Sequence, residues 1–174
     1  MPPTRLITLD DASMLADTLS ANRDFLAPWE PLRDDAYATP RGQRTVIRAA
    51  LEQCEQGTTL PRVILDETGR VVGRITLNGI VRGAFQSCSV GFWLSADTTG
   101  HGLATAALRD VIQIAFQELG LHRVQAECLL HNVRSQRVLD RAGFMRFGVA
   151  PTYLKIAGEW QDCAIYQLVS PDPS

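Results

Sequence analysis

Residues 92–108 read FWLSADTTGHGLATAAL, a stretch that joins the end of a strand, a turn with two glycines and the start of a helix. Gly100 and Gly102 are one residue apart, and apolar residues recur at helical spacing from Leu103 onward. The unpaired N–H groups and partial positive charge of a helix N-terminus favour anions, and glycine lets a phosphate approach the backbone. The stretch therefore predicts an anion-binding turn.

Three kinds of turn share this glycine spacing. A P-loop would need Lys followed by Ser or Thr after the second glycine, but Leu103 and Ala104 follow here. A dinucleotide-binding fingerprint would need a third glycine where this chain has Thr105. On the glycines alone, a flexible turn without a ligand stays a third alternative. The surrounding residues must decide among them.

Hydrophobic periodicity along the rest of the chain predicts helices and strands in one α+β domain. Strands are expected at 5–9, 60–65, 71–77, 88–94, 122–130, 144–154 and 163–168, and helices from Asp10 or Asp11 through Leu19, from Pro40 to Gln56, from 103 to 119 and from Asn132 to Ala142. The sequence DETG at 66–69 is typical of a hairpin. Because there are no repeats or linkers, we expect a single domain at 1–170 and a tail at 171–174.

The composition is that of a soluble globular protein, with 45% hydrophobic and 21% charged residues. A net charge of -2 argues against general nucleic-acid binding, because phosphate binding needs clustered Lys and Arg. The chain shows neither an apolar signal core nor a membrane-spanning run, so no membrane association is expected. Cys54, Cys88, Cys128 and Cys163 lack metal-ligand spacing and indicate buried apolar positions in a reducing compartment. We expect no metal site and a cytoplasmic location.

Together with HNVRSQRVLDRAGF at 131–144, the opening stretch resembles the acetyl-coenzyme A (acetyl-CoA) site of the GCN5-related N-acetyltransferases, the GNAT family. The resemblance implies the GNAT fold, a mixed and mostly antiparallel sheet of about six to seven strands with helices on both faces. It also implies that the strand end binds pantetheine through its backbone and that the turn amides hold the pyrophosphate. The implied cofactor-binding residues are Phe92, Trp93, Leu94, Thr99, Gly100, His101, Gly102, Leu103, Ala104, Thr105 and Asn132.

One position departs from the family pattern. Asp97 stands where an Arg or Gln often precedes the first glycine by three residues, and it places a carboxylate near the phosphate site. We expect Asp97 to point away and the backbone amides to supply the contacts. Arg134, Arg137 and Arg141 are expected to form an outward, solvated face of their helix.

The second motif supplies a catalytic candidate. With Asn132 as the helix cap, Ser135 and Leu139 fall on one face. From the residues alone, a serine there is a bonded core residue, whereas the family resemblance implies a proton donor to the departing thiolate. Glu30, Glu127 and Asp162 are candidates for the general base, and we place Glu30 first.

The stretches NRDFLAPWEPLRD (22–34), IVRGAFQSC (80–88) and TYLKIAGEWQD (152–162) resemble the ribosomal-protein-alanine N-acetyltransferases. The resemblance implies that these stretches form the acceptor groove and that the acceptor is the N-terminal alanine of a ribosomal protein. The implied substrate-binding residues are Phe25, Trp29, Tyr153 and Trp160.

Two other functions stay open. The first is acetylation of a small amine such as an antibiotic or polyamine, but no dense run of carboxylates extends beyond Asp34 and Asp35. The second is a non-enzymatic coenzyme A-binding factor, against which the presence of Asn132 and Ser135 argues. A homodimer is compatible with the sequence.

Overall fold

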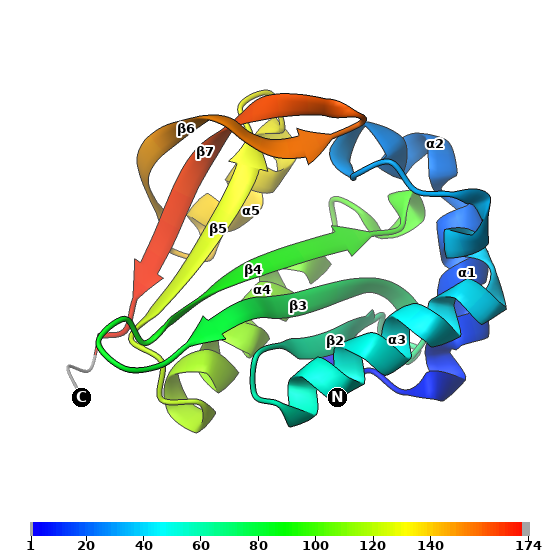
Figure 1. Ribbon diagram of the computed structural model, residues 1–174, viewed down its shortest axis with the longest axis horizontal. Coiled ribbons are helices and arrows are strands. Elements are labelled where there is room, and N and C mark those ends of the chain that lie inside the picture. Colours follow the sequence, from blue (N-terminus) through cyan, green and yellow to red (C-terminus); the bar gives the residue numbers. More distant parts are fainter. Residues whose placement is uncertain (1, 172–174) are drawn as a thin grey trace.

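The computed structural model of the protein describes residues 2–171, which are organised around one seven-stranded sheet (Figure 1). The strands are β1 (Thr4–Leu6), β2 (Leu60–Leu65), β3 (Val71–Val81), β4 (Ser87–Leu94), β5 (Arg123–Leu129), β6 (Met145–Ile156) and β7 (Glu159–Val169). Their order is β1-β2-β3-β4-β5-β7-β6, and only β4 and β5 pair in parallel. The sheet is therefore mixed and mostly antiparallel, which confirms the expectation. The predicted tail at 171–174 lies almost entirely outside the described residues.

Helices cover both faces of the sheet, as predicted. They are α1 (Ala12–Ala21), α2 (Arg23–Leu26), α3 (Pro40–Glu55), α4 (Leu103–Gln113) and α5 (Val133–Arg141). Leu15 of α1 and Ile47 of α3 pack against Val63 in one core cluster, while Leu108 of α4 and Leu139 of α5 belong to a second cluster. Figure 1 shows α3 in front of the sheet and α4 behind it. No helix within residues 2–171 combines the length and apolarity that crossing a membrane requires.

Local capping chemistry sets the helix ends near the cleft. The Asn132 side chain caps α5 by accepting a hydrogen bond from the Ser135 N–H at 3.2 Å, as expected from the sequence. Gly102 precedes α4 with a left-handed φ of 78°, a conformation that favours glycine. A π-helical segment, Ile114–Glu118, follows α4. The predicted helix at 103–119 is thus an α-helix continued by a π-helix.

The predicted bounds of the first strand and of the last two strands need correction. The first strand ends at Leu6 rather than at residue 9, because Leu9–Asp11 forms a 3-10 turn. The Asp11 carboxylate pairs with Arg5 at 2.6 Å and accepts the Thr8 N–H instead of capping α1 with its side chain. The last two strands are longer than predicted, since β6 and β7 form one hairpin around the turn at 157–158.

The parallel pairing between β4 and β5 is short. Only Ser87–Ser89 pairs with Arg123–Gln125, after which the two strands diverge toward Leu94 and Leu129 (Figure 1). The β4 backbone from 90 to 94 consequently has no strand partner on its β5 side within the described sheet. This divergence leaves polar backbone groups free to bind a ligand that lies along the end of β4.

Candidate active site

A large cleft lies where β4 and β5 diverge, and its volume is about 1180 Å³. Residues 90–94 of β4 and 126–129 of β5 form its walls, together with the glycine turn and α5. Phe25, Leu26 and Trp29, from α2 and the 3-10 turn Ala27–Trp29, line the cleft from the other side. The cleft therefore follows the end of β4 and reaches the start of α4 and α5.

The glycine turn is built to approach an anion closely. Gly100 and Gly102 line the cleft and have φ values of 87° and 78°. A Cβ added to either glycine would meet no atom within 4 Å, so the space beside each is open. The N–H groups of residues 103–105 precede the first intrahelical bond, which joins the Ala106 N–H to the Gly102 carbonyl. These features fit the phosphates of acetyl-CoA.

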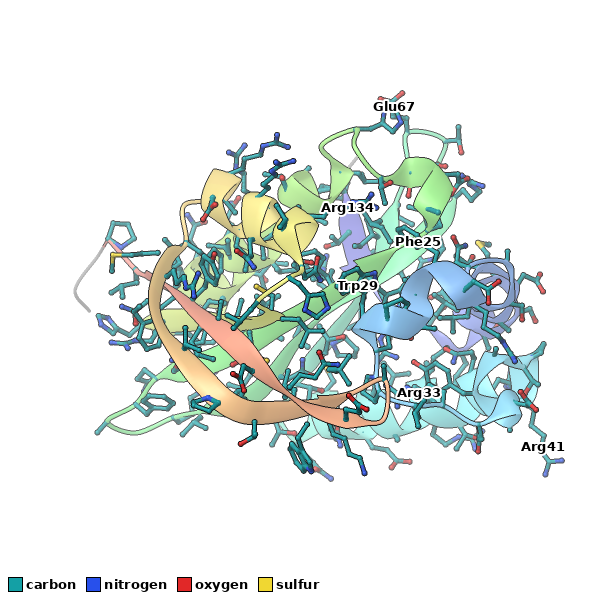
Figure 2. All side chains as sticks on the ribbon, turned by 90° about the horizontal axis from the view of Figure 1, so that it is seen from above. Phe25, Trp29, Arg33, Arg41, Glu67 and Arg134 are labelled. Atoms are coloured by element: carbon teal, nitrogen blue, oxygen red, sulfur yellow. The ribbon has the colours of Figure 1, made fainter. Side chains whose placement is uncertain are left out.

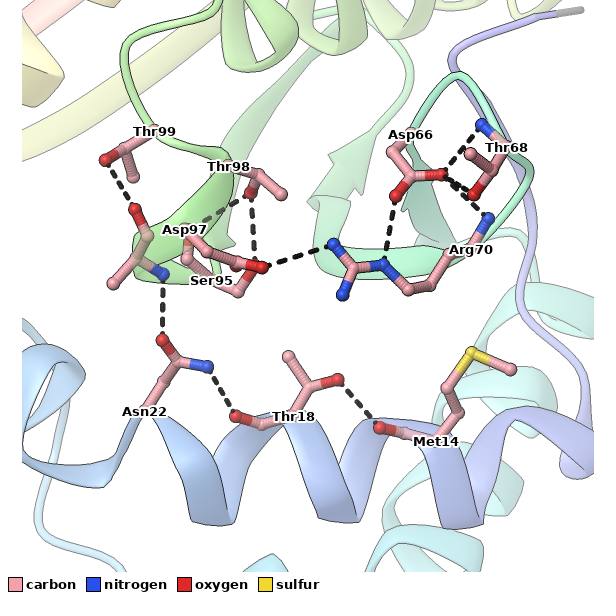
Figure 3. Close-up of polar contacts among 11 residues, drawn as sticks. Met14, Thr18, Asn22, Asp66, Thr68, Arg70, Ser95, Asp97, Thr98 and Thr99 are labelled. Atoms are coloured by element: carbon pink, nitrogen blue, oxygen red, sulfur yellow. Dashed lines mark hydrogen bonds and ion pairs between the residues drawn. The ribbon is translucent and has the colours of Figure 1, made fainter.

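The segment before the glycines is held by hydrogen bonds from two directions (Figure 3). The Asp97 carboxylate accepts from the Ser95 hydroxyl at 2.6 Å and pairs with Arg70 at 3.2 Å. On the other side, the Ala96 N–H donates to the Asn22 side chain at 2.8 Å. The Ser95 hydrogen bond and the Arg70 charge lower the pKa of Asp97. Asp97 lies outside the residues that line the cleft, which agrees with the expectation that it points away.

Most of the predicted cofactor-binding residues line the cleft. These are Phe92, Trp93, Leu94, Thr99, Gly100, Gly102, Ala104 and Asn132. His101, Leu103 and Thr105 are not among the lining residues: His101 is exposed, Leu103 packs against the core and Thr105 is buried. The side chains of these three residues therefore do not reach the cleft, and only their backbone groups stay candidates for binding.

The α5 helix presents both polar and cationic groups to the cleft. Ser135 lines the cleft, as do Arg134, Arg137 and Arg141. All three arginines are exposed, in agreement with the expected solvated face, and this exposed side of α5 also borders the cleft. Their guanidinium groups can hold anionic groups of the cofactor. The Asn132 carbonyl oxygen is used for capping, which leaves its NH₂ group as a donor toward the cleft.

Two aromatic residues after α1 reach across the cleft (Figure 2). The Arg134 guanidinium lies 5.5 Å from the centroid of the Phe25 ring. The rings of Trp29 and His131 have centroids 5.4 Å apart and are tilted by 38°. Both predicted aromatics thus line the cleft, where Phe25 contacts α5 and Trp29 contacts the β5–α5 connection.

Of the three candidate bases, Glu127 alone lines the cleft with Ser135. The Ser89 hydroxyl donates a hydrogen bond of 2.6 Å to the Glu127 carboxylate, which fixes its position. Asp162 accepts the Thr152 N–H at 2.8 Å in the β6–β7 hairpin. The sequence offered no reason to choose Glu127, because the choice depends on where β5 diverges from β4.

Glu30 is not brought into the cleft with Ser135. Its side chain lines a separate, smaller recess together with Arg33 and Tyr37, and burial raises its pKa. The backbone carbonyl of Glu30 accepts the Ala157 N–H at 2.9 Å, which ties this segment to the β6–β7 hairpin. The prediction that Glu30 and Ser135 share one catalytic cleft is therefore not supported by their placement.

The predicted acceptor segments also need correction. Tyr153 and Trp160 do not line the cleft and are 47% and 62% exposed, whereas Leu154 and Ile156 do line it. Successive side chains of a strand point to opposite faces, so Tyr153 faces away from Leu154. The segment 80–88 leads into the start of β4, at the end opposite to the cleft-lining residues 90–94.

Cysteine chemistry at this site is suppressed. Cys54, Cys88, Cys128 and Cys163 are free, and all but Cys54 are buried. Cys128 lines the cleft, and burial raises its pKa to about 11, which keeps the thiol protonated at neutral pH. Within residues 2–171 no group of three or more His, Cys, Asp or Glu side chains is placed to hold a metal ion.

A glycine turn with open space beside it, a strand end with free backbone groups and a serine on a facing helix are the features expected of an acyl-CoA-dependent transferase. Residues 4–145 match the acetyltransferase (GNAT) domain family. The chain is 34% identical over 169 residues to the [ribosomal protein uS5]-alanine N-acetyltransferase of Escherichia coli, covering 97% of this chain and 87% of that protein.

Two solved structures share the fold. The ribosomal-protein-S5-alanine acetyltransferase from Vibrio fischeri superposes with a TM-score of 0.91 at 31% identity, covering 97% of this chain and 93% of that one. Mycobacterium smegmatis RimJ, in complex with CoA-disulfide, has a TM-score of 0.92 at 29% identity, covering 96% of this chain and 81% of that one. The protein belongs to the GNAT family and is an acetyl-CoA-dependent N-acetyltransferase.

Replacing Gly102 by valine should weaken coenzyme A binding by well over tenfold, because a branched side chain would fill the open space beside the turn. Calorimetry on the folded variant measures the affinity. Gly57→Val is a matched control, since Gly57 has a φ of 73° and equally open surroundings but ends α3. Equal affinity in both variants would contradict a phosphate contact at Gly102.

Proposed function

We propose that this enzyme acetylates the N-terminal α-amino group of a polypeptide, and that the physiological acceptor is the N-terminal alanine of a ribosomal protein. The observation that carries the proposal is the 34% identity to a uS5-alanine N-acetyltransferase, which extends over 97% of this chain. Such coverage includes the segments on both sides of the cleft as well as the cofactor motifs.

Proton removal from the acceptor is assigned to Glu127. An α-amino group has a pKa of about 7.7–8.0, so a single carboxylate suffices to take its proton near neutral pH. Glu127 is held by Ser89 and lines the cleft beside the free end of β4. The deprotonated nitrogen then attacks the thioester carbon, and a backbone N–H of residues 90–94 stabilises the carbonyl oxygen as it gains negative charge.

Departure of the sulfur is assigned to Ser135. When the tetrahedral intermediate collapses, the carbon–sulfur bond breaks and the sulfur takes the electron pair of that bond. The Ser135 hydroxyl supplies a proton to the sulfur, which leaves as a thiol. The nitrogen loses its second proton as the intermediate collapses to the amide. Of the two protons that leave the nitrogen, one returns to Ser135 through solvent and the other is released to solvent, so the reaction is balanced.

Cofactor binding is assigned to groups that border the same path. The Asn132 NH₂ group donates to pantetheine, and the N–H groups of residues 103–105 bind the pyrophosphate. Arg137 and Arg141 add positive charge beside the turn. The free cysteines support a cytoplasmic location, and exposed apolar residues Met145 and Phe147 on the edge strand β6 support a homodimer.

An Ala-initiated peptide should be acetylated once, at its N-terminus, while the same peptide with a blocked N-terminus and free lysines should not react. A lysine amine, with a pKa of about 10.4, stays almost wholly protonated at neutral pH and needs a stronger base than this cleft offers. Mass spectrometry locates the acetyl group, and spermidine and kanamycin serve as competing acceptors. Acetylated lysine side chains, or turnover with the small amines alone, would overturn the choice of acceptor.

A further inference from the structure

Arg74 lies on the sheet face that the cofactor does not use. It pairs with Val63 on β2 and Trp93 on β4, and both partners pack with the cluster beneath α1 and α3. Its neighbour Ile75 belongs to the opposite cluster beneath α4. Since α4 begins at the phosphate-binding turn, the acceptor amine must approach the diverging strands from the face of Arg74.

The Arg74 guanidinium lacks a partner in a partly buried position. Its Nε atom is buried and has no hydrogen-bond partner, and none of the ion pairs within residues 2–171 includes Arg74. Burial lowers its pKa, Tyr37 acts in the opposite direction, and the positive charge of Arg33 lowers it further. A buried guanidinium without a carboxylate is costly, so a ligand that carries one would be favoured here.

The neighbouring groups add a second cation, Arg33, which shares a recess with the partly buried Glu30 carboxylate. The Arg33 guanidinium stacks on Tyr37, 4.4 Å from the ring centroid. Asp34 is occupied by the Tyr37 N–H at 2.9 Å, and Asp35 pairs with Arg23 at 3.0 Å. Arg74, which has no acidic partner, and Arg33, whose charge also acts on Glu30, form a positive site beside the loop that carries the cleft-lining residue Trp29 (Figure 2 labels Arg33 and Trp29).

The strand register places this positive site at a definite distance from the proposed base. Ser89, which holds Glu127, pairs with Asn78, and Trp93 pairs with Arg74. Ser89 and Trp93 are four residues apart on β4, about 13 Å along the strand. An extended acceptor whose α-amine reaches Glu127 covers that distance in about four residues.

We propose that Arg74 and Arg33 form a carboxylate-binding subsite that selects acceptor polypeptides with Asp or Glu at about the third to fifth position. This inference rests on the proposed N-terminal acetylation and names the class of acceptor. A bidentate pair between Arg74 and the acceptor carboxylate would satisfy the orphaned Nε and neutralise the buried charge. Arg33 would contribute mainly through its charge.

The test is a set of Ala-initiated peptides that differ only by Glu, Gln or Lys at positions three to five. At the preferred position, the Glu peptide should have a kcat/KM about tenfold higher than that of the Gln peptide with the wild-type enzyme, mostly because its KM is lower. The Lys peptide should react more slowly than the Gln peptide. In Arg74→Gln the preference for Glu should vanish, while the rate with the Gln peptide and the affinity for coenzyme A stay unchanged. Arg33→Gln should lose part of the preference.

Arg48→Gln is the matched control, because Arg48 is an exposed arginine of α3, and it should keep the full preference. Equal rates with Glu and Gln at every position, or an Arg74→Gln variant that keeps the preference, would overturn the proposal. If Arg74→Gln does not fold, the peptide series with the wild-type enzyme and the Arg33→Gln variant still test the proposed carboxylate subsite. If no peptide is acetylated at its N-terminus while small amines are, the proposed function fails instead.

Discussion

Replacing Glu127 by glutamine should lower kcat about a hundredfold at neutral pH. Glutamine keeps the shape of the side chain and can still accept the Ser89 hydrogen bond, but it cannot take a proton from the acceptor amine. Thiol release from acetyl-CoA, with an Ala-initiated peptide as acceptor, measures the effect. Coenzyme A affinity should stay close to the wild-type value, because the proposed role concerns the acceptor alone.

The pH dependence separates a base from a structural residue. Above a pKa of about 7.7–8.0 the acceptor amine is already deprotonated in solution, so the deficit of Glu127→Gln should shrink as the pH rises. A deficit of constant size across this range would indicate that Glu127 acts only through Ser89 and the local structure. Glu30→Gln is the decisive comparison, because Glu30 lines a different recess and its variant should turn over normally.

Replacing Ser135 by alanine should lower kcat by roughly tenfold to a thousandfold, with little change in the affinity for coenzyme A. The lost hydroxyl would protonate the leaving sulfur, so its absence affects the transition state and not the bound cofactor. The α5 cap should survive, because the Asn132 side chain bonds the backbone N–H of Ser135 and not its hydroxyl. Steady-state kinetics and calorimetry on one preparation give both quantities.

Ser13→Ala supplies a matched control for this variant. Ser13 is an exposed serine of α1, and its loss should change neither quantity. If Ser135→Ala turns over at the wild-type rate at every pH, the Ser135 hydroxyl takes no part in the reaction and has only a structural role in α5. A parallel loss of turnover and coenzyme A affinity would assign it to cofactor binding.

Local sequence was sufficient for the elements that carry the cofactor. Gly102 and Asn132 act through backbone conformation and capping, which depend on residues within one or two helical turns. The alternating apolar pattern of residues 88–94 likewise located β4 and the strand end that lines the cleft. These features were predictable because the same short-range physics creates the anion site and shapes the chain around it.

Tertiary structure decided which polar side chains share the site. Glu30 and Glu127 look alike in sequence, yet only Glu127 lies on the part of β5 that diverges from β4 and lines the cleft. Arg137 occupies a helix face that the cleft borders, whereas Tyr153 is turned away from it by the alternation of β6. Each outcome depends on strand register and on contacts between residues far apart in the chain, which local periodicity does not encode. The sequence by itself thus determined the family, the fold and the conformation of the glycine turn, and the packing of distant strands determined which side chains line the cleft.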